Sequence, residues 1–175
     1  MIFVVNGYAD QSKNFFNGSK KVTLLENNGA EVDIGTIHFS QQQQKISYKL
    51  EISHQRFVDY FLSMKEMKCL EGPELWCHLA YPYKNPHLVQ RDDFRWLSHD
   101  LLFMHKKKSD FGANFYNGIY YQFTFANNRL VGHAMAMDLN ILAAPPDDMA
   151  TPPIAEYDIE EMELSTRWLP TIEIK

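Results

Sequence analysis

Several features that mark well-known protein classes are missing from this sequence of 175 residues. No apolar run approaches the ~18 residues that a membrane-spanning helix requires. The apolar stretch Met1–Val5 is short and has no basic leader, so it does not look like a signal peptide, and we expect a cytoplasmic protein. Glycine-rich dinucleotide and phosphate-binding motifs do not occur, which argues against the common types of nucleotide-dependent enzyme.

Cysteine is scarce, with only Cys69 and Cys77 in the chain. In a reducing compartment these two residues are expected to be free thiols. Structural zinc is usually bound by cysteine and histidine pairs about two to four residues apart, and the wider gap between Cys69 and Cys77 does not fit that spacing. We therefore expect no metal site and no cofactor.

Positive charge is also in short supply, because 17 Lys and Arg residues face 22 Asp and Glu residues, for a net charge of −5. A general nucleic-acid binder needs a basic face to displace counterions from phosphates, so this balance argues against one. The exception to consider is Lys106–Lys108, a basic run near Tyr116, Tyr120 and Tyr121 whose rings could stack on a single strand. Three lysines in a loop are more typical of a solvated turn.

The clearest positive signal is strict alternation of apolar and polar residues in two segments. In Lys45–Ile52 every second residue is apolar, and Ile119–Ala126 follows the same rule. Side chains on a strand point alternately to opposite faces, so each segment has one apolar and one hydrated face. Such strands are typical of an antiparallel sheet that packs on one side.

The whole chain, residues 1–175, is predicted to form one globular domain of the α+β class that is mainly β, with an antiparallel sheet arranged as a sandwich or a partly open barrel. A helix is expected at residues 54–66, where apolar residues keep helical spacing, and a short helix at 92–98 with Asp92 as its cap. A change of parity at Gly35 predicts a β-bulge. Further strands are expected at Ile2–Val5, Val22–Glu26, Glu31–Phe39, Glu74–Tyr81, Leu101–Met104, Arg129–Leu139, Tyr157–Leu164 and Thr171–Lys175.

Aromatic residues make up 14% of the chain, which fits either a β-rich core or a ligand cleft lined by rings. Prolines at positions 82 and 86 bracket a rigid loop that is followed by Trp96, and loops on a rigid sheet commonly carry function. A second loop, Asp110–Asn117, could extend the same surface. The predicted binding residues are Tyr81, Tyr83, His87, Trp96, Asn114 and Tyr116.

A catalytic alternative remains open at the same segment. Cys77 with a histidine, or a histidine with an acid, would suit a small hydrolase or isomerase, and His87, His99 and Asp100 are available. The residues around Cys77 are apolar, and the glycine-flanked serine elbow of hydrolases is absent from the sequence. No catalytic residue is therefore assigned.

Three segments resemble an uncharacterised bacterial protein family with no assigned activity. They are Phe61–Tyr83, Trp96–Phe103 and Asp110–Tyr121, which together make up less than half of the chain. The resemblance implies a compact bacterial domain and carries no substrate or site residues.

These observations favour a non-enzymatic cytoplasmic binding or protein-interaction domain, with the small His/Asp or Cys/His enzyme as the alternative. The expected partner is a protein or a small ligand, and neither a membrane nor a nucleic acid. Homo-oligomers through an exposed strand edge or the tail Tyr157–Lys175 are a further possibility.

Overall fold

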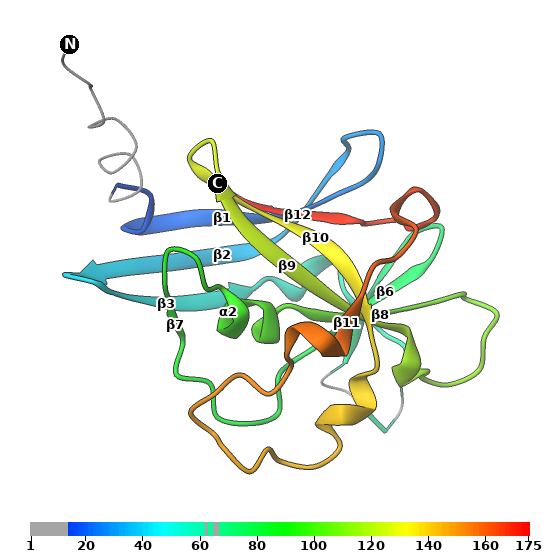
Figure 1. Ribbon diagram of the computed structural model, residues 1–175. Coiled ribbons are helices and arrows are strands. Elements are labelled where there is room, and N and C mark those ends of the chain that lie inside the picture. Colours follow the sequence, from blue (N-terminus) through cyan, green and yellow to red (C-terminus); the bar gives the residue numbers. More distant parts are fainter. Residues whose placement is uncertain (1–13, 62, 65–66) are drawn as a thin grey trace.

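The computed structural model describes residues 14–61, 63–64 and 67–175 (Figure 1). The strands are β1 (Gly18–Leu25), β2 (Glu31–Gln42), β3 (Lys45–Ile52), β4 (Val58–Asp59), β5 (Lys68–Glu71), β6 (Leu75–Leu79), β7 (Leu88–Val89), β8 (Leu102–Lys106), β9 (Gly118–Ala126), β10 (Arg129–Met137), β11 (Ile159–Glu160) and β12 (Thr171–Ile174). The α-helix is α2 (Arg95–Asp100), and short 3₁₀ helices are η1 (His54–Arg56), η2 (Phe115–Asn117), η3 (Leu139–Leu142), η4 (Glu156–Asp158) and η5 (Leu164–Thr166).

The strands form one antiparallel sheet in the order β4-β5-β6-β8-β9-β10-β12-β1-β2-β3-β7, with β11 paired to β10. The predicted mainly β, antiparallel architecture is therefore confirmed. The C-terminal strand β12 lies between β1 and β10 and so joins the first meander to the later strands. None of the helices in the described part of the chain is long and apolar enough to cross a membrane.

The first meander follows the sequence pattern closely. β3 has the predicted bounds Lys45–Ile52 and pairs with β2 along its whole length. The register of β2 against β1 shifts between Val22 and Thr23, opposite Gly35 and Asp33, which is the bulge expected at Gly35. A Cβ atom at Gly35 would lie 2.2 Å from the backbone oxygen of Glu51, so only glycine fits here.

The central strands β6, β8 and β9 send alternate side chains into two separate cores. Trp76, Phe103 and Tyr121 belong to the first core, which also holds the buried residues of β1, β2, β3 and β12. The other face contributes to the second core, which is closed by η3 and the loop that follows it; its buried members include Cys77, Met104, Tyr120, Leu139, Leu142 and Ile154. β6 and β8 are therefore covered on both faces, and β9 is covered on both faces as far as Tyr121.

The predicted helix at residues 54–66 is wrong over its described part. Only η1 is helical, and the chain then forms β4, which pairs with β5. Val58 and Tyr60 are 44% and 37% exposed, so the apolar residues of this segment do not form one buried face. Pairing with β5, a strand that the sequence pattern did not reveal, replaces the helix.

The second predicted helix is confirmed with shifted bounds, since α2 occupies Arg95–Asp100. Asp92 does not cap it; the side chain of Asp93 accepts a hydrogen bond from the backbone N–H of Arg95 instead. The expected late strand Tyr157–Leu164 shrinks to β11 between two 3₁₀ turns. The strand expected at Ile2–Val5 lies outside the described residues.

The two cysteines are not free thiols, which corrects the sequence expectation. Cys69 and Cys77 form a disulfide between β5 and β6, where they lie directly opposite each other. Glu71 and Leu75 are paired at the tight turn of this hairpin. A hairpin places opposite residues within bonding reach, and this removes the free thiol that a Cys77 nucleophile would need.

Replacing Gly35 with alanine is expected to lower the free energy of unfolding by about 2–4 kcal/mol, because the new methyl group collides with backbone of β3. Urea unfolding followed by circular dichroism measures the change. Thr36→Ala, one residue along on the exposed face, should change the free energy by less than about 1 kcal/mol. Equal effects of the two substitutions would contradict this account of the bulge.

Candidate functional site

Three of the predicted binding residues, Tyr81, Tyr83 and Trp96, come together around His99. The ring centroid of Tyr81 lies 5.7 Å from that of Tyr83, 6.1 Å from that of Trp96 and 5.2 Å from that of His99. The Tyr83 hydroxyl donates to the carbonyl of Leu142 at 2.6 Å. Trp96 is only 8% exposed, so this cluster mainly packs the loop before Lys84 against α2 and η3.

His87, also predicted, lies in a different cluster around the carboxylate of Asp100. The Tyr48 hydroxyl donates to Asp100 Oδ2 at 2.7 Å, and His87 Nδ1 lies 3.0 Å from the same oxygen. Because a carboxylate oxygen accepts, Nδ1 carries the proton and the lone pair of Nε2 remains available. The side chains of His87 and Asp100 are 51% and 15% exposed, so the acid is sheltered while the imidazole reaches solvent.

Local backbone structure holds His87 in place. Its φ of +53° lies in the left-handed region, which is uncommon for a residue other than glycine. The Asn85 side chain accepts from the backbone N–H of His87 at 2.8 Å, and the backbone N–H of Tyr48 donates to the carbonyl of His87 at 3.0 Å. Three neighbours, Asn85, Tyr48 and Asp100, therefore hold this residue, and the contact of Nδ1 with Asp100 orients its imidazole.

The C-terminal end of α2 also binds His78 of β6, whose Nε2 donates to the backbone carbonyl of Asp100 at 2.9 Å. Burial lowers the pKa of His78, so the ring is neutral at physiological pH. No group of three or more potential metal ligands was found among residues 14–61, 63–64 and 67–175. The cluster can orient one imidazole for proton transfer, but it brings no serine or cysteine nucleophile to His87.

Beside this cluster lies a surface groove of about 540 Å³ between the segment 84–96 and the loop 149–152, which we call the Trp96 groove. Most of its wall is apolar, with charged groups at its edge. The lining includes Lys84, Leu88, Arg95, Trp96, Met149 and Pro152. Two neighbouring grooves of about 460 and 850 Å³ adjoin it, and Gln90 lines all three. The segment Leu88–Arg95 is thus bordered by concave surface on several sides.

Strand β7 ends the sheet, and no strand in residues 14–61, 63–64 and 67–175 pairs with its outer edge. The bond from Tyr48 N to His87 O makes these two residues a hydrogen-bonded pair of the antiparallel ladder. The next pair, Ser47 with Leu88, is then a non-bonded one, so the N–H and C=O of Leu88 point away from β3. Leu88 therefore presents backbone polar groups as well as its side chain at the Trp96 groove.

An ion pair separates the Trp96 groove from the second groove. Arg95 binds the carboxylate of Asp93 with two nitrogens, at 2.9 Å from Nε to Oδ1 and 2.7 Å from Nη2 to Oδ2. This hydrogen bonding lowers the pKa of Asp93 and fixes the guanidinium at the rim. Both residues line both grooves, so the pair forms part of their common wall.

His99 links α2 to the segment around Ile154, which follows the groove-lining loop 149–152. Its Nδ1 donates to the carbonyl of Arg95 at 2.7 Å, and its Nε2 accepts from the backbone N–H of Ile154 at 3.2 Å. This arrangement requires a neutral ring, because protonated Nε2 cannot accept a hydrogen bond. Burial lowers the pKa of His99 to about 4, which keeps the ring neutral at physiological pH.

The remaining predicted residues, Asn114 and Tyr116, lie on another loop. The Asn114 side chain accepts from the backbone N–H of Tyr116 at 3.1 Å and caps η2, while the Tyr116 ring is 73% exposed. The stacking surface considered for a nucleic acid does not form, because Tyr120, Tyr121 and Lys106 are buried. Of the three tyrosines, Tyr116 alone presents its ring to solvent.

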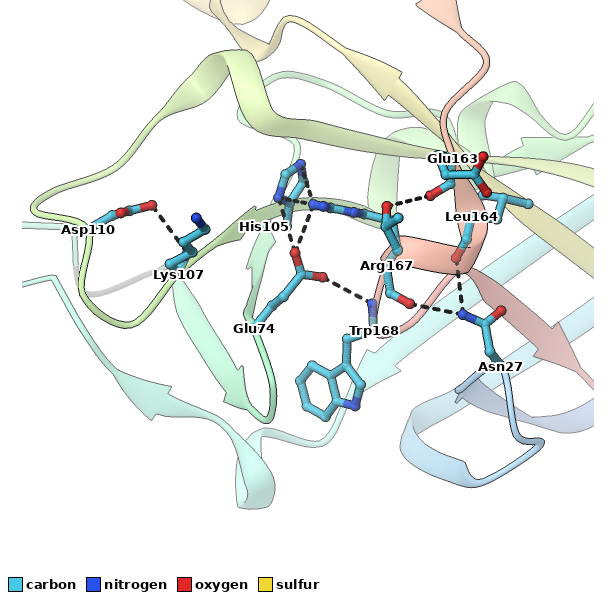
Figure 2. A network of polar contacts seen from close by, with 10 residues as sticks. Asn27, Glu74, His105, Lys107, Asp110, Glu163, Leu164, Arg167 and Trp168 are labelled. Atoms are coloured by element: carbon cyan, nitrogen blue, oxygen red, sulfur yellow. Dashed lines mark hydrogen bonds and ion pairs between the residues drawn. The ribbon is translucent and has the colours of Figure 1, made fainter.

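A second polar network joins segments far apart in the sequence (Figure 2). Glu74 binds Arg167 at 2.8 Å and accepts from the backbone N–H of Trp168 at 3.0 Å. Arg167 Nη1 donates to the ring of His105, whose pKa is lowered to about 4 by burial and by the arginine charge. We interpret this network as structural, because it anchors the C-terminal segment to the β5–β6 turn.

Sequence reasoning missed the central role of Tyr48 and the groove walls at residues 149–154. Tyr48 is 52 positions from Asp100, and nothing local in β3 distinguishes it from a core tyrosine. Comparisons of the chain with protein-family models, curated proteins and solved structures found no match. The resemblance to a bacterial family therefore stays a prediction.

The free energy of unfolding is expected to fall as the pH drops from about 6.5 to about 4. The unfolded chain binds a proton at His99 near pH 6.5, whereas folded His99 binds one only near pH 4, so protonation favours unfolding over this interval. His99 should contribute on the order of 3 kcal/mol to the loss. Urea unfolding at several pH values measures it.

His99→Gln should show a smaller loss over the same interval, whereas His133→Gln, at an exposed position of β10, should behave like the wild type. An unchanged pH dependence in His99→Gln would show that this ring does not hold the groove wall in a neutral form.

Proposed function

We propose that this chain is a non-enzymatic binding domain whose ligand is an extended segment of a partner protein. The observation that carries the proposal is the set of adjoining grooves that share Gln90 beside the uncovered edge of β7. Extended peptides commonly bind with backbone hydrogen bonds at a strand edge and side chains in neighbouring pockets.

The chemistry of the Trp96 groove supports a peptide more than a compact small molecule. Small-molecule sites enclose most of the ligand surface, while these grooves open widely to solvent and follow one another along the surface. Leu88 offers backbone groups, Trp96 and Pro152 offer apolar contact, and Arg95 and Lys84 offer charge at the edge. A segment with an apolar anchor and polar neighbours matches this lining.

Random peptides displayed on phage provide the probe. Peptides selected on the wild-type protein should bind Leu88→Asp at least about tenfold more weakly, because a carboxylate replaces the apolar wall. Val58→Asp adds the same charge at an exposed position of strand β4, outside the grooves, and should leave binding unchanged. Isothermal titration calorimetry measures both affinities.

NMR shifts caused by a selected peptide should map to Gln90, Arg95 and Trp96. The proposal fails if no peptide is enriched, or if the selected peptides bind Leu88→Asp as tightly as they bind the wild type.

A second candidate function, a small hydrolase or isomerase, is favoured by the contact of His87 with Asp100. An imidazole oriented by a sheltered carboxylate is a common general base, and Nε2 of His87 has solvent access. Pro86 and Leu88, the neighbours of His87 in sequence, line the Trp96 groove, so a bound ligand would lie close to this residue.

The hydrolase form of this candidate can be tested with p-nitrophenyl acetate. If His87 is a general base, His87→Gln should lower the rate of ester cleavage by about 10²-fold, and Asp100→Asn should lower it less. His133→Gln serves as the control for a lost exposed histidine. Equal rates for the wild type and His87→Gln would rule out a hydrolase activity that depends on His87.

Of the two architectures expected from sequence, we favour the partly open barrel. β3 and β6 are far apart in the strand order, yet Tyr48 of β3 and His78 of β6 both bind Asp100. The first core also combines residues of β2 and β3 with Trp76 and Phe103 of β6 and β8. Both facts support a sheet that curls around this core.

The disulfide bears on the compartment in which the protein works. A cytoplasmic location was expected from the sequence, but the disulfide between Cys69 and Cys77 favours an oxidising compartment. A protein partner fits either setting.

A further inference from the structure

The loop between β8 and η2 is held rigidly by a buried lysine. Lys106 is 6% exposed, and its Nζ donates to the carbonyls of Asp110 and Gly112 at 2.6 and 2.7 Å. The backbone N–H of Asp110 also donates to the carbonyl of Lys107 at 3.1 Å. These bonds fix residues 107–112, which we call the Phe111 loop.

This rigid loop presents an apolar side chain to solvent. Phe111 is fully exposed, at 105% of the reference value, and Lys107 and Lys108 beside it are also exposed. Leaving a phenylalanine in water forgoes the stabilisation that burial would provide. A pre-organised loop with one projecting aromatic ring has the form of an interface anchor, since rigid aromatic residues dominate binding at protein interfaces.

We propose that the Phe111 loop of one molecule binds in the Trp96 groove of a second copy of the same chain. The inference rests on the proposed peptide-binding role of that groove and names its partner. The Phe111 ring would lie against Leu88, Trp96 and Pro152 in the groove.

Charge supports this pairing. Asp147 and Asp148 are exposed residues directly before Met149, which lines the groove, and in the proposed contact they would pair with Lys107 and Lys108 of the incoming loop. Lys84 at the groove edge offers a counter-charge for Asp110 of the loop. Arg95 is already neutralised by its ion pair with Asp93, so it does not oppose the two lysines as a free charge.

The loop cannot reach the groove of its own molecule. In Figure 1 the light-green loop after β8 projects on one side of the molecule, and the orange loop near residue 150 lies on the other. The contact is therefore intermolecular and joins two different surfaces. Such heterologous contacts form rings or open chains rather than a closed symmetric dimer.

Sedimentation velocity over a range of concentrations tests the proposal. The wild type should sediment faster as its concentration rises towards about 1 mM, because a contact this small is weak. Phe111→Ser, which removes the anchor, and Leu88→Asp, which spoils the groove, should each remain monomeric. Val58→Ser, a change of another exposed apolar residue, should associate like the wild type.

Mixing the two variants gives the decisive result. Leu88→Asp keeps an intact loop and Phe111→Ser keeps an intact groove, so an equimolar mixture should form one-to-one dimers and nothing larger. Lys108→Glu should weaken self-association, and Asp147→Lys in the molecule that supplies the groove should restore binding to that variant. Circular dichroism confirms that each variant is folded.

A wild type that stays monomeric at about 1 mM, or a mixture of the two variants that forms no dimer, would overturn the self-docking proposal. Loss of binding to anionic lipid vesicles in Phe111→Ser, with the wild type monomeric, would instead assign the loop to a membrane surface. Phage-selected peptides that still bind the groove would show that the proposed function survives without the self-contact.

Discussion

Burial of both faces of β6, β8 and the first part of β9 is the constraint on which the rest of the structure depends. Alternation along these strands sends Trp76, Phe103 and Tyr121 to one side and Cys77, Met104 and Tyr120 to the other. Each face has to be covered, because large apolar surfaces are costly to leave in water. The sheet itself and Leu97 of α2 cover the first face, and irregular segments that contribute Leu139, Leu142 and Ile154 cover the second.

The candidate site follows from the way the second face is covered. Loops and 3₁₀ turns fill space less evenly than a strand layer, and grooves remain where α2, β7 and the loop 149–152 meet. Two histidines hold α2 in place beside these grooves: His99 of α2 binds the backbone of Ile154, and His78 of β6 binds the backbone of Asp100 in α2. Both serve as neutral rings, so the walls of the grooves depend on a pH above the range in which these residues ionise.

Sequence patterns predicted the elements whose signals are local. Lys45–Ile52 and Ile119–Ala126 alternate, and both are strands whose apolar faces point to the core as expected; Tyr120, on the face of the second strand expected to be hydrated, is buried as well. The helix at 54–66 failed because its replacement, β4 paired with β5, depends on a partner beyond the local window. In the site, the rings of Tyr81, Tyr83 and Trp96 lie together, but Trp96 is largely buried; the bond from Tyr48 to Asp100 joins β3 to α2 and had no sequence signal.

Hydrogen exchange of the native protein, read by mass spectrometry, tests the two-sided burial most directly. The account predicts that the amides of β8 exchange most slowly, since both of its faces are covered along its length, and that those of the β2–β3 hairpin tip near Gln43 exchange early. If β8 exchanged as fast as the hairpin tip, the second core would not be packed as described, and the grooves built on it would lose their support.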